Sequence, residues 1–249
     1  MKIQIYSDIH IEFYKQFPKI ERNVELLILA GDIGKINLLQ YNKFLDYINS
    51  KWVQVIYILG NHEFYHNKKD YDTLMEDYIK LFNKYERIKL LYDCEEFIYK
   101  GYRFIGCTLW SFASDKLTNC FSKIKMRNIN TNRKSDISID FYNSLYQTQK
   151  QQLIQNIQNN TIIITHYPVI QYNTSSPKYN SQNNEVRNIF ANNILNELNV
   201  TNCVFISGHT HYSFDFTYKN NRFISNQFGY LNELKTCESK LNISGIYDI

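Results

Sequence analysis

Five short polar motifs each follow an apolar segment of strand length, and this repeated placement constrains the fold more than any other feature of the chain. The apolar segments cover residues 2–7, 24–30, 52–59, 161–165 and 203–207. The motifs that end or follow them are Asp8-Ile9-His10, Gly31-Asp32, Gly60-Asn61-His62-Glu63, Thr165-His166 and Gly208-His209-Thr210-His211. Because parallel strands deliver their carboxyl ends to a common edge, we expect these motifs to meet at one rim of a sheet.

The segments between these strands read mostly as helices. Hydrophobic periodicity predicts helices over residues 36–50, 70–85 and 185–198. Two strand pairs complete the pattern: residues 97–108 around Lys100-Gly101, and a hairpin over residues 213–226 that turns at Lys219-Asn220-Asn221. This alternation is typical of an α/β fold. With 249 residues, of which 44% are hydrophobic, the chain can bury a sizeable core as a single domain over residues 1–249.

Residues 111–159 differ in character from the rest of the chain. The segment is polar, its first part lacks clear periodicity, and its end predicts a helix. We interpret it as an insertion or cap over one edge of the core. It carries the clearest basic cluster, which either contacts a substrate phosphate or belongs to a solvated loop. The cluster consists of Lys123, Lys125, Arg127, Arg133 and Lys134.

Five of the six histidines fall inside the motifs. A single histidine at the end of a core strand is more often a hydrogen-bonded structural residue than a metal ligand. Five of them, combined with carboxylates and one amide, instead indicate a pair of closely spaced divalent metals, because such cations share nitrogen and oxygen ligands. Asp32 is the natural bridge, since one carboxylate can hold two cations at the separation of about 3.5–4 Å found in two-metal sites. Asn61 adds a neutral carbonyl oxygen.

The ordered set D-x-H, G-D, G-N-H-E, H and G-H-x-H resembles the calcineurin-like metallophosphoesterases, from Lys2 to about Glu233. The resemblance implies a β-sandwich of two mixed sheets flanked by helices, in four α/β/β/α layers. It also implies two sets of metal ligands that share Asp32. The first set is Asp8, His10, Asp32 and His211, and the second is Asp32, Asn61, His166 and His209.

His62 is not a metal ligand in that scheme. The resemblance implies that it lies beside the metals, is oriented by an acidic neighbour, and stabilises the transferring phosphoryl group or protonates the leaving oxygen. A site with nitrogen and oxygen ligands could bind Mn, Fe, Zn or Ni. Two such divalent ions would lower the pKa of a bridging water, so that hydroxide forms near neutral pH. The expected substrate is a small phosphorylated molecule, such as a nucleotide.

The sequence is most similar to a branch of small cytosolic members of that family. Their signature is present as four segments: Ser7-Asp8-Ile9-His10-Ile11-Glu12-Phe13, Thr108-Leu109-Trp110-Ser111, Ser213-Phe214-Asp215, and Gly229-Tyr230 followed by an acidic residue. The continuation Ile33-Gly34-Lys35 after Asp32 lacks the D-R-G of protein Ser/Thr phosphatases. Two alternatives to a small-molecule hydrolase remain open: a metal-binding scaffold without catalysis, and a nuclease. Trp110 could fill the core or stack on a base, and we favour the core position.

Charge and composition limit the partners and the cellular location that we expect for the chain. The net charge of +4 is too small and too dispersed to indicate a nucleic-acid groove. No apolar run approaches the roughly 20 residues of a membrane span, and strand-like residues stand where a signal peptide would be. The five cysteines form no C-x-x-C pair and are expected to be reduced, mostly buried thiols. We therefore expect a cytoplasmic protein; no pattern specifies its oligomeric state.

Overall fold

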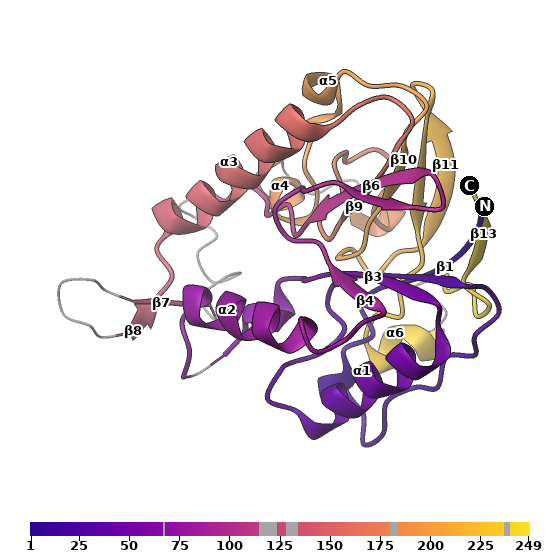
Figure 1. Ribbon diagram of the computed structural model, residues 1–249. Coiled ribbons are helices and arrows are strands. Elements are labelled where there is room, and N and C mark those ends of the chain that lie inside the picture. The colour runs from indigo at the N-terminus through magenta and orange to yellow at the C-terminus, as the bar shows by residue number, and fades with distance from the viewer. Residues whose placement is uncertain (67, 115–123, 128–133, 180–183, 237–239) are drawn as a thin grey trace.

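Two β-sheets lie face to face with helices on both outer sides, as Figure 1 shows. The structure is a computed structural model that describes residues 1–66, 68–114, 124–127, 134–179, 184–236 and 240–249. The two termini lie close together at one end of the sandwich (Figure 1), where the backbone N–H of Ile249 donates to the carbonyl of Met1 at 3.0 Å.

The first sheet has the strand order β13-β1-β2-β3-β4. Its strands are β1 (Lys2–Tyr6), β2 (Leu26–Ala30), β3 (Gln54–Ile58), β4 (Ile88–Leu90) and β13 (Ile246–Asp248). β1 to β4 run parallel, whereas β13 pairs antiparallel with β1. The predicted strands at 2–7, 24–30 and 52–59 are therefore confirmed as adjacent parallel strands.

The second sheet has the strand order β11-β12-β10-β9-β6-β5. Its strands are β5 (Phe97–Tyr99), β6 (Tyr102–Cys107), β9 (Thr161–Thr165), β10 (Val204–Ile206), β11 (Phe214–Tyr218) and β12 (Asn221–Ser225). The four central strands run parallel, and a hairpin closes each edge. Lys219 and Asn220 turn the β11–β12 hairpin with φ of 47° and 56°, the left-handed pair that a two-residue turn requires. Both predicted strand pairs are confirmed.

Apolar residues on both faces of the strands build three core layers. In β2, Leu26 and Ile28 pack between the two sheets, whereas Leu27 and Leu29 pack on the outer side under helices. Successive strand residues point to opposite faces, so a strand buried on both sides needs an unbroken apolar run. This explains why residues 26–30 contain no polar side chain.

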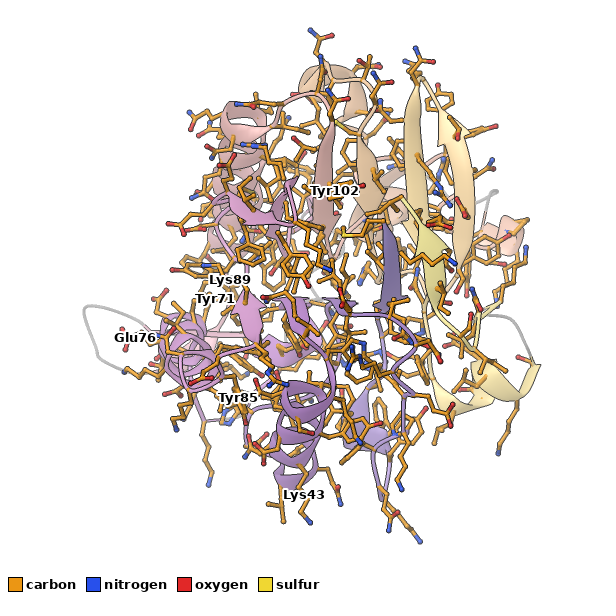
Figure 2. The ribbon with its side chains drawn as sticks, turned by 45° about the vertical axis from the view of Figure 1, so that its right-hand side comes forward. Lys43, Tyr71, Glu76, Tyr85, Lys89 and Tyr102 are labelled. Atoms are coloured by element: carbon orange, nitrogen blue, oxygen red, sulfur yellow. The ribbon has the colours of Figure 1, made fainter. Side chains whose placement is uncertain are left out.

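Helices cover both outer faces of the sandwich. α1 (Leu39–Lys51) and α2 (Tyr71–Phe82) lie against the first sheet, and α3 (Ile139–Asn156) lies against the second. The Asp70 carboxylate caps α2 by accepting the N–H of Thr73 at 2.9 Å, which satisfies a backbone donor of its first turn. The outer faces of α1 and α2 carry polar side chains, such as Lys43 on α1 and Glu76 on α2 in Figure 2. The predicted four-layer α/β/β/α fold is confirmed.

The short helices and the small sheet lie in the connections between these elements. They are η1 (Ile11–Phe13), η2 (His62–Phe64), η4 (Pro177–Tyr179), α4 (Asn184–Phe190), α5 (Leu195–Leu198), α6 (Leu231–Thr236), β7 (Lys125–Arg127) and β8 (Lys134–Asp136).

The prediction of one helix over residues 185–198 was wrong, because the chain leaves the helix between α4 and α5. The backbone N–H of Asn192 donates to the carbonyl of Pro168 at 2.8 Å, and that of Ile194 donates to Val169 at 3.0 Å. The Asn192 side chain also donates to the carbonyls of Leu109 and Trp110, at 3.3 Å each. Pairing with the segment after β9 thus replaces the helical hydrogen bonds, which amphipathic periodicity could not reveal.

The segment 111–159 is described only in part. β7 and β8 form an antiparallel pair in which Lys125 makes an ion pair with Asp136. Lys123 and Arg133 lie outside the described residues, so the basic cluster as a phosphate contact stays a prediction, as do the limits of an insertion. At the end of the segment, Leu153 of α3 is buried in the core beside the second sheet.

The cysteines and the helices bear on two further expectations. Cys94, Cys107 and Cys203 are buried free thiols, as predicted, while Cys120 and Cys237 lie outside the described residues. In the part of the chain that the structure describes, no helix has the length and apolar character needed to cross a bilayer.

Candidate metal centre

The polar motifs meet at one rim of the sandwich, where the parallel strands of both sheets end. Backbone hydrogen bonds join the loops that carry them. The N–H of Asp8 donates to Gly31 and the N–H of His10 donates to Asp32, each at 3.0 Å. Within the second sheet, the N–H of Gly208 donates to the carbonyl of His166 at 3.0 Å, and across the two sheets the N–H of Gly229 donates to the carbonyl of Asp8 at 3.1 Å. Residues from opposite ends of the sequence are therefore held as one loop cluster.

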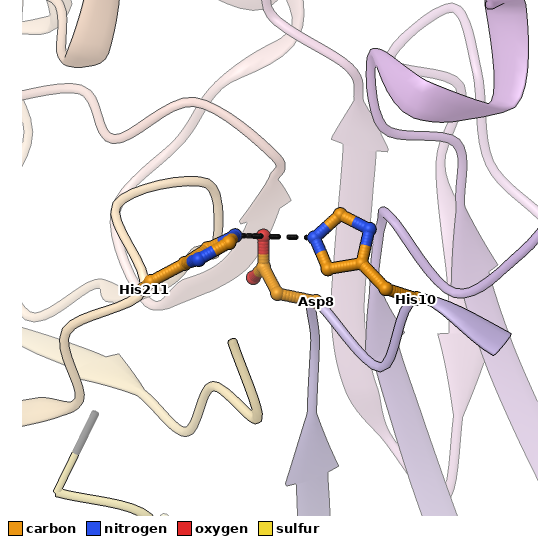
Figure 3. A group of neighbouring side chains, drawn as sticks. All are labelled: Asp8, His10 and His211. Atoms are coloured by element: carbon orange, nitrogen blue, oxygen red, sulfur yellow. Dashed lines mark hydrogen bonds and ion pairs between the residues drawn. The ribbon is translucent and has the colours of Figure 1, made fainter. Parts of the chain in front are cut away.

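Asp8, His10 and His211 form the first group, shown in Figure 3. The Nε2 atoms of His10 and His211 are 3.1 Å apart, and His211 Nε2 is 3.5 Å from Asp8 Oδ1. His211 Nδ1 donates to Glu233 Oε2 at 2.6 Å, and His10 Nδ1 contacts Glu12 Oε1 at 3.4 Å. With both Nδ1 protons engaged, two bare Nε2 lone pairs face one another. Such a pair repels unless a cation or proton lies between, so the group fits a metal.

Asp32, His166 and His209 form the second group, and Asn61 adds an oxygen to it. His166 Nε2 lies 2.9 Å from Asn61 Oδ1 and 3.4 Å from Asp32 Oδ1. Its Nδ1 donates to the carbonyl of Ala30 at 2.9 Å, which leaves Nε2 directed at the group. The buried Nε2 of His209 has no hydrogen-bond partner among the described residues. An orphaned nitrogen beside a carboxylate and an amide oxygen fits a divalent cation.

The Asp32 carboxylate lies between the two groups. Oδ1 faces His166, while Oδ2 is 3.9 Å from His10 Nε2. Glycine is required at position 60, because a Cβ there would overlap both the Asp32 side chain and its backbone nitrogen. The buried Glu63 carboxylate fixes the same loop by accepting the N–H groups of Asp32 and Gly60, each at 3.0 Å, and that of Ile33 at 2.9 Å. Asp32 is thus placed to serve both groups, as a bridging ligand must.

The backbone at these positions is in the left-handed region. The φ angles of Asp8, His10, Asp32, His209 and His211 are 53°, 51°, 54°, 72° and 51°. A residue with a Cβ pays about 1–3 kcal/mol for such a conformation, which persists only where the surroundings impose it. Such strain is common at functional sites and here bends each strand end so that its side chain turns toward the centre.

Electrostatics at the site favour added positive charge. Burial lowers the pKa of His166, but the Asp32 carboxylate more than offsets this and raises it to about 9. Burial likewise opposes protonation of His211, whose pKa is nevertheless raised by Glu233 and Asp8. The buried carboxylates therefore draw protons onto neighbouring imidazoles, and divalent cations would satisfy the same charge.

His62 lies beside both groups. Its Nε2 is 4.0 Å from Asp32 Oδ2, and its Nδ1 is 3.3 Å from Glu12 Oε1. Glu12 therefore contacts the Nδ1 atoms of His10 and His62 with one oxygen. Burial raises the pKa of Glu12, yet the two imidazole hydrogen bonds outweigh it and lower the pKa to about 2. Since His10, Asp32 and His62 also form a possible metal-ligand group, geometry alone leaves two roles for His62.

A cavity of about 380 Å³ opens from the metal centre. The candidate ligands Asp32, Asn61, His209 and His211 line one end of it together with His62. Its other walls carry aromatic and aliphatic side chains together with a few polar ones, one arginine and the Glu233 carboxylate. They include Tyr65, Tyr142, Tyr167, Tyr179, Arg187, Phe190 and Tyr230. Trp110 is fully buried, which confirms its predicted core position, although it also reaches the inner wall.

The structure brings to the site several residues to which the sequence assigned no role, among them Glu12, Glu233, Arg187 and Phe190. Glu12 and Glu233 each bond to a histidine ring. Both belong to the family signature segments, so their spacing from His10 and Tyr230 was a sequence signal that could have indicated this role. Arg187 and Phe190 came from a segment predicted as an ordinary helix, and the sequence carried no signal for their place in the cavity.

The family comparison agrees with this geometry. Residues 1–213 match the family model described as calcineurin-like phosphoesterase. An uncharacterized protein, L509, of Acanthamoeba polyphaga mimivirus is 30% identical over 263 aligned positions, covering 94% of this chain and 93% of that protein. Among solved structures, the phosphopantetheinyl hydrolase of Mycobacterium tuberculosis is similar with a TM-score of 0.68 at 15% identity, covering 100% of this chain and 95% of that one. At that identity the likeness concerns the fold alone. The chain belongs to the calcineurin-like phosphoesterase family.

Proposed function

We propose that the chain hydrolyses phosphoesters with two divalent metals and with His62 as the proton donor. Mn, Fe, Zn and Ni all suit its mixed nitrogen and oxygen ligands. One metal would be held by Asp8, His10 and His211, the other by Asn61, His166 and His209, with Asp32 shared. When bound, such metals supply hydroxide from water near neutral pH and neutralise the phosphoryl oxygens.

The observation that carries the proposal is the position of His62, at the edge of the ligand groups and in the wall of the cavity. The Glu12 carboxylate accepts its Nδ1–H, which fixes the orientation of the ring. Nε2 then faces the cavity end near Asp32, the position from which a proton donor could reach a bound phosphoester. A leaving alkoxide accepts the donor's proton as the P–O bond breaks, so that it departs as an alcohol.

His62 is not needed to complete either ligand set. Each set already contains four groups when Asp32 is counted in both, and the His62 side chain keeps 14% of its surface exposed. A complete set beside a free histidine favours an enzyme over a metal-binding scaffold, because a scaffold needs no proton donor. The cavity has room for a small organic phosphoester rather than a duplex, which favours a small-molecule substrate over nucleic acid.

The test is a substrate panel with metal-reconstituted protein. Bis-p-nitrophenyl phosphate, p-nitrophenyl phosphate and cyclic nucleotides are assayed with each metal, beside Asp32→Asn and the matched surface variant Asp140→Asn. We expect hydrolysis by the wild type and by Asp140→Asn, and its loss in Asp32→Asn with the fold retained by circular dichroism. Inactivity of the wild type on every substrate with every metal would support the scaffold instead.

A further inference from the structure

The walls of the cavity beyond the metal centre carry a feature that hydrolysis itself does not require. Cavities of this size hold whole organic ligands rather than an isolated phosphate group. The lining includes several aromatic side chains, and two of their rings, Tyr179 and Phe190, are 45% and 46% exposed. Half-exposed aromatic rings at a binding cavity are surfaces that a ligand can cover.

Tyr179 and Phe190 present their rings in nearly the same orientation. The two planes differ by 8°, and the ring centroids are 6.5 Å apart. The residues come from different elements, η4 and the end of α4, so their parallel setting is a feature of the tertiary fold. Parallel rings offer stacking surfaces to a flat, aromatic partner, which an aliphatic chain would use less well.

This pair of rings reaches the metal centre. The centroid of the Phe190 ring is 5.8 Å from that of His209, with 32° between their planes. The wall therefore runs from a proposed metal ligand through Phe190 to Tyr179. This wall suits a molecule whose phosphate lies at the proposed metal ligands and whose flat ring is separated from the phosphate by a spacer of about the size of a sugar.

Arg187 adds a fixed positive charge to the same wall. It stands three residues before Phe190, a spacing that places both on one side of α4, and both line the cavity. Among the residues that the structure describes, none forms an ion pair with it. An unneutralised guanidinium suits an anionic substrate, whose oxygens it can bind in a bidentate manner.

We propose, on the basis of the hydrolase function above, that the substrates are phosphoesters of nucleosides, with the base stacked on Tyr179 and Phe190. The cavity size, the parallel rings, their continuity with His209 and the cation beside them all fit this class. The rings then act on substrate binding, whereas the metals and His62 act on the phosphoryl group.

Matched substrates test the proposal. Adenosine 5′-monophosphate and ribose 5-phosphate carry the same sugar phosphate and differ in the base, and each is also assayed as its methyl diester. We expect the base to raise kcat/KM at least about tenfold in one of the two pairs, in keeping with the strength of base stacking on aromatic side chains. Equal values with and without the base would overturn the inference and leave the hydrolase intact, whereas failure to hydrolyse any phosphoester would overturn the proposed function itself.

Variants locate the effect. In Tyr179→Leu and Phe190→Leu we expect KM for the base-bearing substrate to rise about tenfold, which lowers its advantage in kcat/KM over ribose 5-phosphate by the same factor. Phe112→Leu is the matched control, because Phe112 is 45% exposed but does not line the cavity. Tyr179 makes no ring contact with a proposed metal ligand, so an unchanged KM in Tyr179→Leu contradicts the stacking role directly.

Discussion

Glu12→Gln tests the hydrogen bond that orients His62, and bound metal is measured alongside because the same Glu12 oxygen also contacts the proposed ligand His10. Oε1 of Glu12 contacts the Nδ1 atoms of His10 at 3.4 Å and His62 at 3.3 Å, while the buried Oε2 has no partner within the described part of the chain. Glutamine keeps the size and one acceptor oxygen but removes the charge. Its amide nitrogen would also place two N–H donors at a buried position where the carboxylate oxygen has no hydrogen-bond partner among the described residues.

The magnitude follows from the loss of charge in hydrogen bonds that are largely shielded from water. The Glu12 side chain is 10% exposed, and a hydrogen bond to a charged group contributes about 1.5–3 kcal/mol. Because each 1.4 kcal/mol is a factor of ten, we expect kcat to fall roughly 10- to 100-fold, the range typical when a partner of a metal-bound histidine is removed. KM should change little, since Glu12 does not line the cavity.

The assay compares kcat and bound metal in four proteins: wild type, Glu12→Gln, His62→Asn and the double variant. We expect the double variant to lose little more than His62→Asn alone, because both changes remove one proton-donating unit. Glu76→Gln on the exposed face of α2 is the matched control. Full activity of Glu12→Gln, or losses that multiply in the double variant, would refute the reasoning.

Two further predictions concern stability. Glu63→Gln should lower the free energy of unfolding by about 2–4 kcal/mol in urea titrations, because at least one buried N–H among its backbone partners then faces an amide donor. The control Glu76→Gln should change that free energy by less than about 0.5 kcal/mol. A change that small in Glu63→Gln would contradict the prediction. Chelation of bound metal should lower the melting temperature by at least about 5 °C, since ligands held at 100 times Kd add about 2.7 kcal/mol per site. An unchanged melting temperature would count against a structured metal centre.

Much of the fold was predictable because the strands that carry the motifs are buried on both faces. An unbroken apolar run such as residues 26–30 is a strong local signal, and the polar motif after it marks where the strand ends. The meeting of the motifs at one rim also followed, since parallel strands share a direction. The family resemblance extended this to the two-sheet architecture.

Other features depend on contacts between distant segments, which periodicity does not encode. The break between α4 and α5 arises because Asn192 bonds to the loops after β6 and β9. β13 exists because residues 246–248 add to the edge of β1. Tyr179 and Phe190 become parallel only when η4 and α4 pack together. Each is a tertiary effect that overrides or lacks a local signal.

The measurement that tests the central claim most directly is the metal content and turnover of His62→Asn, determined on the same sample. We expect two metal ions per chain by elemental analysis, as in the wild type, and a kcat reduced at least about 100-fold, in line with the contribution of a general acid. Loss of one metal together with activity would instead make His62 a ligand. Two metals with undiminished turnover would remove it from the reaction and contradict the account.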